Sequence, residues 1–284
     1  MLVEGEYFNK EIRSLKGFSD AKKIVFNNKI PNDIDKIEHL KLDKERSGNI
    51  VAYIKDNTIY ISSNEKIYAN EYSYALMKDL KNIEEVDLSN LDTSKVVDIS
   101  SLFNGCSNLK TINVDNLNTS KVKNMSEMFT NCNNLKEIDL EDIDTENVEN
   151  MSNMFFGCFN LEKLDLSNFK TSKVEDMSRM FAGCSNLKSV DLEYLNTSNV
   201  TNMDYMLYGC YNLNANINIE NVVSDYNKVF EHCSEEEGSK LTVNYTNDKT
   251  KMIAENMIKT KSDLSNIVLG NILKSKIDNN KNND

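Results

Sequence analysis

Apolar residues recur along this chain with a period of 26 residues. Five full repeats begin at Met77, Phe103, Phe129, Phe155 and Phe181. When the positions in each repeat are numbered from 1 to 26, positions 1, 4, 7, 10, 12, 15, 20, 23 and 26 are apolar in all five. A degenerate copy begins at Leu207 and a truncated one at Phe230. A fixed period of this length is typical of stacked repeats that bury one continuous core between them.

The spacing of the apolar positions changes within a repeat, and each spacing predicts a different local structure. Positions 7, 10 and 12 are Leu161, Leu164 and Leu166 in the fourth repeat, and their final alternation predicts a short strand. Positions 20, 23, 26, 1 and 4 lie on one face of a helix of about three turns. Asn or Asp at position 22 suits the start of that helix, and Gly or Asn at position 3 suits its end.

These patterns predict an α/β solenoid of the leucine-rich-repeat type, with one short strand and one short helix in each 26-residue coil. Before the repeats, residues 50–61 (IVAYIKDNTIYI) predict a β-hairpin that turns at Asp56-Asn57. After them, residues 250–266 predict a helix whose apolar face holds Met252, Ile253, Met257 and Ile258, and residues 266–273 predict a final strand. We therefore expect an N-terminal mixed cap with the hairpin (1–76), the solenoid (77–244), a C-terminal helical cap (245–274) and a disordered tail (275–284).

Two polar columns accompany the apolar ones. Asn occupies position 6 of each repeat from Asn82 to Asn212, and Thr occupies position 17 from Thr93 to Thr197. A buried turn leaves backbone groups without partners, so we interpret the Asn column as an amide ladder that satisfies them from repeat to repeat. The Thr column has the composition of a loop cap.

All six cysteines fall at position 4, on the apolar side of the repeat: Cys106, Cys132, Cys158, Cys184, Cys210 and Cys233. The first repeat has Leu80 at this position, so we interpret it as a packing position that holds buried free thiols. The sequence contains no CxxC, and its only histidines are His39 and His232. This composition predicts no metal site and no cofactor.

Charge and motifs narrow the classes of function. The formal net charge of −12 disfavours nucleic acid and anionic membrane surfaces as partners. No stretch reaches the ~18 consecutive apolar residues of a membrane span, so we expect no membrane insertion. The first residues, MLVEGEYFNKEIRS, lack the basic and apolar regions of a signal peptide. No nucleophile elbow, phosphate-binding loop or dinucleotide fingerprint is present, so we expect no enzymatic activity.

The outward-facing positions of the predicted strands are the candidate binding surface. Position 11 forms an acidic column, and lysines stand beside it at positions 8 and 9. The candidate residues are Asp87, Asn113, Asp139, Asp165, Asp191, Lys136, Lys163 and Lys188. Like charges ~4.8 Å apart in neighbouring strands repel each other, so this column requires an explanation. One interpretation is that each Asp accepts hydrogen bonds from the following loop, and the other is that the column recruits a basic partner or a divalent cation.

The repeat unit F-x-G-C-x-N-L-x-x-[ILV]-D-L-x-x-[LF]-x-T-S-x-V-x-N-M-S-x-M resembles the BspA-like leucine-rich repeats of bacterial surface proteins. The resemblance covers residues 77–233 and extends to the flanking segments IKDNTIYISSNEKIYANE (54–71) and VNYTNDKTKMI (243–253). It implies surface display, adhesion and binding to host or neighbouring-cell proteins, with no catalytic residues. It also implies a cell-surface or extracellular location, although no leader, lipoprotein cysteine or wall anchor is visible in the sequence, which leaves a cytoplasmic location open.

Two hypotheses follow. In the first, the chain is a monomeric protein-binding module of a bacterial cell surface that uses the outward face of its strands. In the second, the repeats are a structural spacer, and the caps or a fusion partner do the binding.

Overall fold

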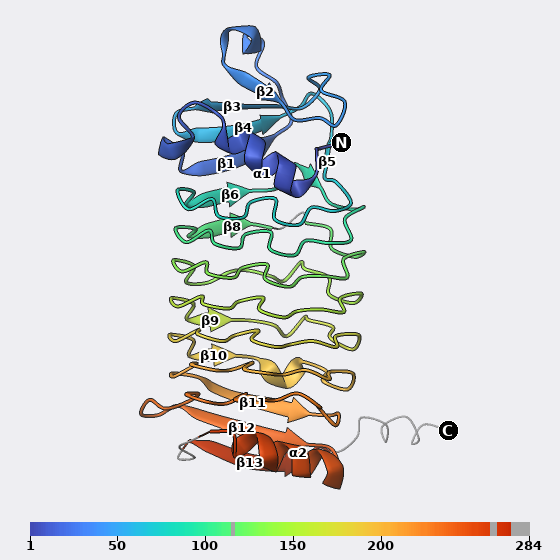
Figure 1. Ribbon diagram of the computed structural model, residues 1–284, viewed down its shortest axis with the longest axis vertical. Coiled ribbons are helices and arrows are strands. Elements are labelled where there is room, and N and C mark those ends of the chain that lie inside the picture. Colours follow the sequence, from blue (N-terminus) through green and yellow to red (C-terminus); the bar gives the residue numbers. More distant parts are fainter. Residues whose placement is uncertain (115–116, 262–265, 274–284) are drawn as a thin grey trace, which may run out of the picture.

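The computed structural model describes residues 1–114, 117–261 and 266–273, and Figure 1 shows the repeats stacked between two end segments. The α-helices of the described residues lie at the two ends and are α1 (Gly5–Arg13) and α2 (Asp248–Ile258). Short 3₁₀ turns are η1 (Phe18–Asp20), η2 (Ile34–Lys36) and η3 (Leu192–Tyr194). The predicted tail at 275–284 lies outside the described residues, and the division of the chain into four segments stays a prediction.

A six-stranded mixed sheet forms the N-terminal end, in the order β2-β3-β4-β1-β6-β8. Its strands are β1 (Lys23–Asn27), β2 (His39–Lys41), β3 (Val51–Lys55), β4 (Thr58–Ser62), β6 (Glu85–Asp87) and β8 (Thr111–Asn113). β3 and β4 pair antiparallel with Lys55 opposite Thr58, so the predicted hairpin is confirmed. Asp56 and Asn57 both have positive φ, 48° and 56°, as the tight turn between twisted strands requires. β1 then joins the hairpin to the repeats by pairing parallel with β4 and β6.

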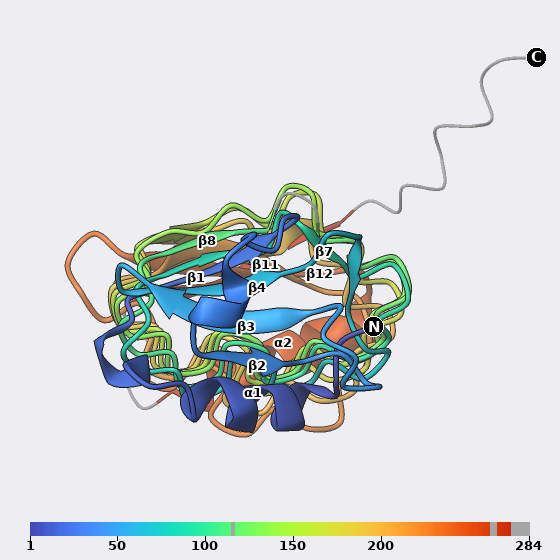
Figure 2. The same ribbon diagram turned by 90° about the horizontal axis from the view of Figure 1, so that it is seen from above.

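A five-stranded sheet forms the C-terminal end, in the order β13-β12-β11-β10-β9, and all its pairings are parallel. Its strands are β9 (Lys163–Leu164), β10 (Ser189–Val190), β11 (Asn214–Ile219), β12 (Lys240–Tyr245) and β13 (Ile267–Ile272). The predicted final strand is therefore confirmed. A small sheet at one corner pairs β5 (Ile67–Tyr68) with β7 (Leu91–Asp92). Figure 2 shows β8, β11 and β12 on one side of the stack and the turn segments of the repeats on the other.

The prediction of an α/β solenoid with a helix in each coil is wrong. The N-terminal sheet mixes parallel and antiparallel strands, the described residues contain two α-helices, and both helices lie outside the 26-residue repeats. Where helices were expected, the chain forms successive turns. Position 22, expected to start a helix, instead forms parallel bridges from repeat to repeat, which link Tyr72, Asp98, Asn124, Asn150, Asp176, Asn202 and Asp225 in that order.

Left-handed backbone explains why no helix forms. Glu127 at position 25 and Asn131 at position 3 have φ of 59° and 58°, and the other repeats place positive φ at the same two positions. A residue with positive φ interrupts a right-handed helix. The N–H groups of Glu127 and Phe129 therefore donate to the carbonyls of Ser152 and Met154, each 25 residues further along the chain, at 2.9 and 2.8 Å. The residue between them, Met128, donates three residues back to Met125, and this local three-residue period reproduces the apolar spacing that predicted a helix.

The core is a continuous column through the repeats. Every apolar position of the five full repeats is buried except position 10 of two neighbouring repeats, Ile112 and Ile138. The rings of Phe103, Phe129, Phe155 and Phe181 stack nearly parallel, with centroids 5.6, 5.5 and 5.7 Å apart. Offset stacking of this kind adds to the burial of the rings.

Helix α2 lies where a helix was predicted and begins with a capping box between Asn247 and Thr250. Its buried face differs from the expected one. Ile253 and Met257 are buried as predicted, together with Thr250 and Ala254, whereas Met252 is 56% exposed. Met252 precedes Ile253 by one residue, and residues one apart point about 100° from each other around a helix.

Helix α1 supplies hydrogen-bond donors to the exposed end of the stack. In the interior, the carbonyls of positions 26 and 2 accept N–H groups that lie 25 residues earlier in the chain, as Leu102 and Asn104 accept from Met77 and Asp79. The equivalent carbonyls of Leu76 and Lys78 have no repeat before them to supply such donors. The Asn9 amide donates to both, at 3.3 and 2.9 Å, and Arg13 donates to Lys78 at 2.7 Å.

We predict that Asn9→Ala lowers the free energy of unfolding by about 1–3 kcal/mol, because the Leu76 carbonyl loses this donor and the Lys78 carbonyl keeps only Arg13. Chemical denaturation measures this change. Lys10→Ala, at the exposed neighbouring position of α1, is the matched control and should leave stability nearly unchanged. Equal losses for the two variants would contradict this function of α1.

Candidate protein-binding face

The outward face of the strands carries the candidate residues predicted from the sequence. In β6, Val86 is buried while Glu85 and Asp87 on either side of it face outward, and the same alternation occurs around Leu164 and Val190. Asp87 lies in β6, Asn113 in β8 and Lys163 in β9, whereas Asp139 lies in a segment without a strand. The role of these residues in binding stays a prediction.

Three members of the acidic column support the loop that follows them. Oδ1 of Asp87, Asp139 and Asp165 accepts the backbone N–H two residues later, at 3.0, 3.0 and 2.9 Å. The side-chain and backbone hydrogen bonds of Ser167 lower the pKa of Asp165. These contacts correspond to the loop interpretation of the column. Asp191 differs because it stands directly before η3, and burial, followed by the charges of Asp165 and Glu193, raises its pKa.

The lysines beside the column divide into paired and unpaired ones. Lys188 forms an ion pair with Glu162 of the preceding repeat at 2.9 Å, and Lys110 does the same with Glu84 at 2.6 Å. The hydrogen bond and charge of Lys188 lower the pKa of Glu162, with smaller contributions from the charges of Lys136 and Lys163. Within the residues that the structure describes, Lys136 and Lys163 form no ion pair. They therefore remain available cations on this face.

A hollow interrupts this face between the two large sheets. β8 ends the N-terminal sheet and β9 ends the C-terminal one, while residues 135–140, which lie between them, form no strand. Ile112 and Ile138 line the hollow together with Lys136, Asp139 and Asp165. The structure thus brings three predicted residues together, and Asp87, Lys163, Lys188 and Asp191 lie outside the hollow. The sequence does not reveal that Ile112 and Ile138 are part of this surface, because they occupy a position that is buried in every other full repeat.

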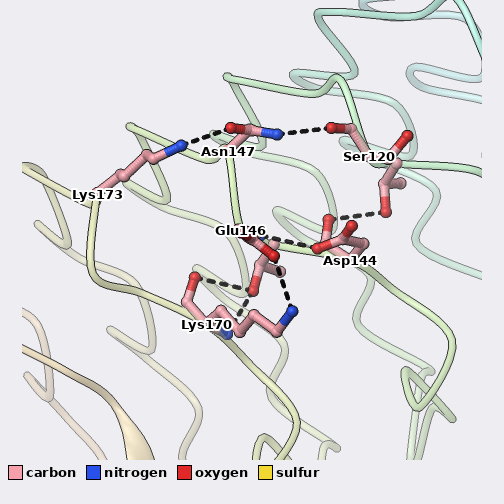
Figure 3. A network of polar contacts seen from close by, with 8 residues as sticks. Ser120, Asp144, Glu146, Asn147, Lys170 and Lys173 are labelled. Carbon is pink, nitrogen blue, oxygen red and sulfur yellow. Dashed lines mark hydrogen bonds and ion pairs between the residues drawn. The ribbon is translucent and has the colours of Figure 1, made fainter.

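The corner between the strands and the turns, at positions 16 to 19, holds a network of polar contacts (Figure 3). Lys173 donates to the Asn147 side chain at 2.6 Å, and Asn147 donates to the Ser120 carbonyl at 2.8 Å, so three repeats are linked in series. Lys170 pairs with Glu146 at 2.8 Å, and this pairing lowers the pKa of Glu146. Because each contact joins successive repeats, the network stabilises their stacking.

Beneath this corner lies the threonine column, and all five of its members are buried. Thr119 donates to the Asp144 carbonyl of the next repeat at 2.9 Å, and Thr171 donates to Asn196 at 3.0 Å. Thr145 both donates to the Lys170 carbonyl at 3.2 Å and accepts the Lys170 N–H at 2.7 Å. The asparagine column acts in the opposite direction, since Asn160, Asn186 and Asn212 donate to carbonyls of the preceding repeat at 2.7, 2.9 and 2.8 Å. The predicted amide ladder is confirmed.

The cysteines form a third column and are free and buried. The thiol of Cys158 donates to the Phe129 carbonyl of the preceding repeat at 3.0 Å, and Cys184 and Cys210 repeat this contact at 3.1 Å. Leu80 occupies the same position in the first repeat, where no full repeat precedes it to present a carbonyl for such a contact. Burial raises the pKa of Cys106, Cys158 and Cys233 to about 12. No cluster of three or more His, Cys, Asp or Glu side chains placed to hold a metal ion occurs among the described residues.

The repeats match the model of a protein family described as "Mycoplasma protein of unknown function, DUF285", over residues 72–163 and 129–244. The two matches overlap and together span more than half of the chain. The chain belongs to this family. No curated protein matches the chain. The description of the DUF285 family names no activity. Within the described residues, no helix has the length and apolar character needed to cross a membrane.

We predict that Thr145→Val lowers the free energy of unfolding by about 1–3 kcal/mol, since the N–H and the carbonyl of Lys170 both lose their buried partner. Thr171→Val removes one hydrogen bond of the same column and should cost less, about 0.5–1.5 kcal/mol. Chemical denaturation of both variants checks the order. An equal or larger loss for Thr171→Val would mean that the double contact of Thr145 has no energetic weight.

We also predict that all six thiols resist a polar thiol reagent at pH 8 in the native protein and react on unfolding. A buried thiol with a pKa near 12 is neither accessible nor deprotonated at that pH. Mass spectrometry after labelling in buffer and in denaturant measures the difference. Rapid labelling of several cysteines in buffer would show that the column is open to solvent.

Proposed function

We propose that the chain is a non-catalytic protein-binding module that uses the outward face of its strands. Its partner is a protein on the surface of a host or neighbouring cell. In this proposal the chain is a BspA-like member of its family, displayed on a bacterial cell or released from it, and it acts in adhesion. The observation that carries the proposal is the hollow between β8 and β9, which is lined in part by two partly exposed isoleucines.

The chemistry of the hollow supports a protein partner. Ile112 and Ile138 offer apolar surface at a position that the other full repeats bury completely. Lys136, Asp139 and Asp165 place both signs of charge around them. Protein interfaces usually combine apolar side chains with polar and charged ones. The charged residues of the hollow also limit the partner to one that presents complementary charges, which favours specificity more than affinity.

A structural spacer is the second candidate, and a different observation favours it. Parallel bridges at position 22 run without interruption from Tyr72 to Asp225. Polar ladders of Thr, Asn and Cys join the same repeats, so the array holds its two ends at a fixed distance. In this alternative the strand face binds nothing, and the end segments or a fusion partner carry the interaction.

The two candidates predict different results for variants of the hollow. We predict that a double variant, Lys136→Glu with Ile138→Asp, loses at least about tenfold in affinity for surface proteins that the wild type retains from host or neighbouring-cell membranes. Affinity is measured on the purified partner after its identification from the pull-down. Lys163→Glu is the matched control, because Lys163 lies on the same face outside the hollow.

Melting curves of the variants establish that the fold is intact. Unchanged affinity of the double variant would overturn the assignment of the hollow. Binding that depends on the end segments and not on the strand face would favour the spacer.

A further inference from the structure

The parallel hydrogen-bond ladder of the strand face is interrupted at one place, beside the hollow. Elsewhere along the described repeats, the N–H of position 8 donates to the carbonyl of position 8 in the preceding repeat. These contacts measure 2.8, 3.0, 2.9 and 2.9 Å, from Lys110 to Glu84, Glu162 to Lys136, Lys188 to Glu162 and Asn214 to Lys188. Over the described ranges 1–114, 117–261 and 266–273, the equivalent contact from Lys136 to Lys110 is absent.

The interruption leaves backbone donors and acceptors without partners on both sides of the hollow. Residues 137–139 make no hydrogen bond through their N–H or carbonyl groups within the described part of the chain. On the other side, Thr111 and Asn113 of β8 form backbone hydrogen bonds with the preceding repeat at 3.3 and 3.4 Å. Because alternate residues of a parallel strand direct their backbone groups to opposite sides, the N–H and carbonyl of Ile112 face residues 137–139.

The gap is confined to the strand face. Elsewhere in the same two repeats, the Phe103 and Phe129 rings stack 5.6 Å apart, and the Asn134 side chain donates to that of Asn108 at 3.1 Å. The hollow is therefore a recess in an intact stack, and a ligand can enter it without separating the repeats. Its volume of about 970 Å³ is within the usual range of ligand-binding clefts, ~300–1,000 Å³.

Unpaired backbone groups define the class of ligand. An open strand edge is a template for another extended chain, whose N–H and carbonyl groups recur at the same spacing. Main-chain pairing of this kind is a general mode of peptide recognition, in which alternate side chains supply the specificity. No aromatic side chain lines the hollow among the described residues, so a sugar ring has no platform on which to stack. Ile112 and Ile138 instead offer partly exposed apolar surface to aliphatic side chains.

The charges around the hollow specify the other side chains of the ligand. The carboxylates of Glu137, Asp139 and Asp165 line it, and all three residues are exposed. Lys136 is the unpaired cation of the hollow within the described residues, since Lys110 is bound to a glutamate of the preceding repeat at 2.6 Å. Basic side chains opposite the carboxylates and one acidic side chain opposite Lys136 complement this arrangement.

We propose that the hollow binds an extended segment of the partner protein, which pairs through its main chain with the unpaired groups of β8 and of residues 137–139. Aliphatic side chains on one side of the segment contact the two isoleucines. Mainly basic side chains on the other side meet the carboxylates. This inference rests on the proposed function for the location of the site and adds how the partner is recognised there.

The probe is a synthetic peptide with blocked ends, Glu-Val-Arg-Val-Arg-Val, titrated into the full chain and followed by ¹⁵N NMR. Binding should shift the amide signals of Ile112 and of residues 137–139. In the free protein, the Ile112 amide should exchange with solvent faster than that of Val86, which lies between two pairing strands. The peptide should slow the exchange of the Ile112 amide.

Two further peptides carry N-methyl groups, either on the three valines or on the other three residues. These groups remove alternate backbone donors and keep every side chain, so at least one of the two peptides should bind about tenfold or more weakly.

A charge variant of the protein tests the side-chain contacts. Glu137→Gln with Asp139→Asn should weaken binding by about threefold or more, because two carboxylates are lost. An amide oxygen at position 139 can still accept the Glu141 N–H, so the loop should keep its support. Asp191→Asn with Glu193→Gln removes the same charge from this face outside the hollow and is the matched control.

The proposal is overturned if the peptide does not bind, if both N-methylated peptides bind as tightly as the unmodified one, or if the charge variant and its control have equal affinity. Calcium-induced shifts of the same amides, without a response to the peptide, would assign the hollow to a cation and would also overturn it. If the partner protein still loses affinity for Lys136→Glu with Ile138→Asp, the proposed function stands although this mode of recognition fails.

Discussion

Backbone hydrogen bonding between repeats is the interaction on which the rest of this structure depends. On the turn side, alternate N–H groups leave their own turn and donate to carbonyls 25 residues further along the chain, as Glu127 and Phe129 donate to Ser152 and Met154. This requires left-handed residues at positions 25 and 3, which turn successive peptide groups along the stack axis. Once the repeats are in register, every side chain stands above its equivalent. The Phe stack, the polar ladders and the candidate strand face are consequences of that register.

How much of this fold the sequence predicts depends on what each residue type reveals. The apolar positions predict the core well, because burial of a repeated position follows from its period whatever the backbone does. They mislead about the helix, because a succession of three-residue turns and an α-helix return apolar residues to one face at nearly the same spacing. Position 25 gives no warning, since Ser101, Glu127, Asn153, Arg179 and Tyr205 are not residues that mark left-handed backbone. The glycines at position 3 do indicate left-handed backbone, but glycine at the end of an α-helix has the same conformation, so they do not exclude a helix.

The candidate surfaces were predictable to different degrees. The outward face of the strands follows from the alternation of apolar and polar residues. The sequence also shows the acidic column at position 11 and allows both interpretations of it. The hollow was not predictable, because Ile112 and Ile138 have the same apolar character as their buried equivalents and differ only in the break of the sheet beside them. Two exposed aromatic residues can be recognised from the sequence alone. Phe159 and Tyr211 stand at a position where the other repeats carry lysine, serine or asparagine, and comparison of aligned repeats finds such a change directly.

Each column of donors points in one direction, and this polarity determines what the two ends of the stack must provide. The threonine hydroxyls of position 17 and the turn-side N–H groups of positions 23, 25, 1 and 3 donate toward the C-terminus, while the Asn amides and Cys thiols donate toward the N-terminus. At the N-terminal end, the side chain of Asn82 therefore needs acceptors, and the carbonyls of Phe18 and Ala21 supply them at 2.7 and 2.9 Å.

The C-terminal end has the opposite need, for donors. The buried ammonium group of Lys261 donates to the Cys233 carbonyl of the last repeat at 2.7 Å. A buried lysine is costly unless its charge is well solvated by such contacts. Its presence there follows from the same rule that places Asn9 and Arg13 at the other end. The end segments are therefore not only covers for apolar surface, because they complete hydrogen-bond columns that a repeat cannot complete for itself.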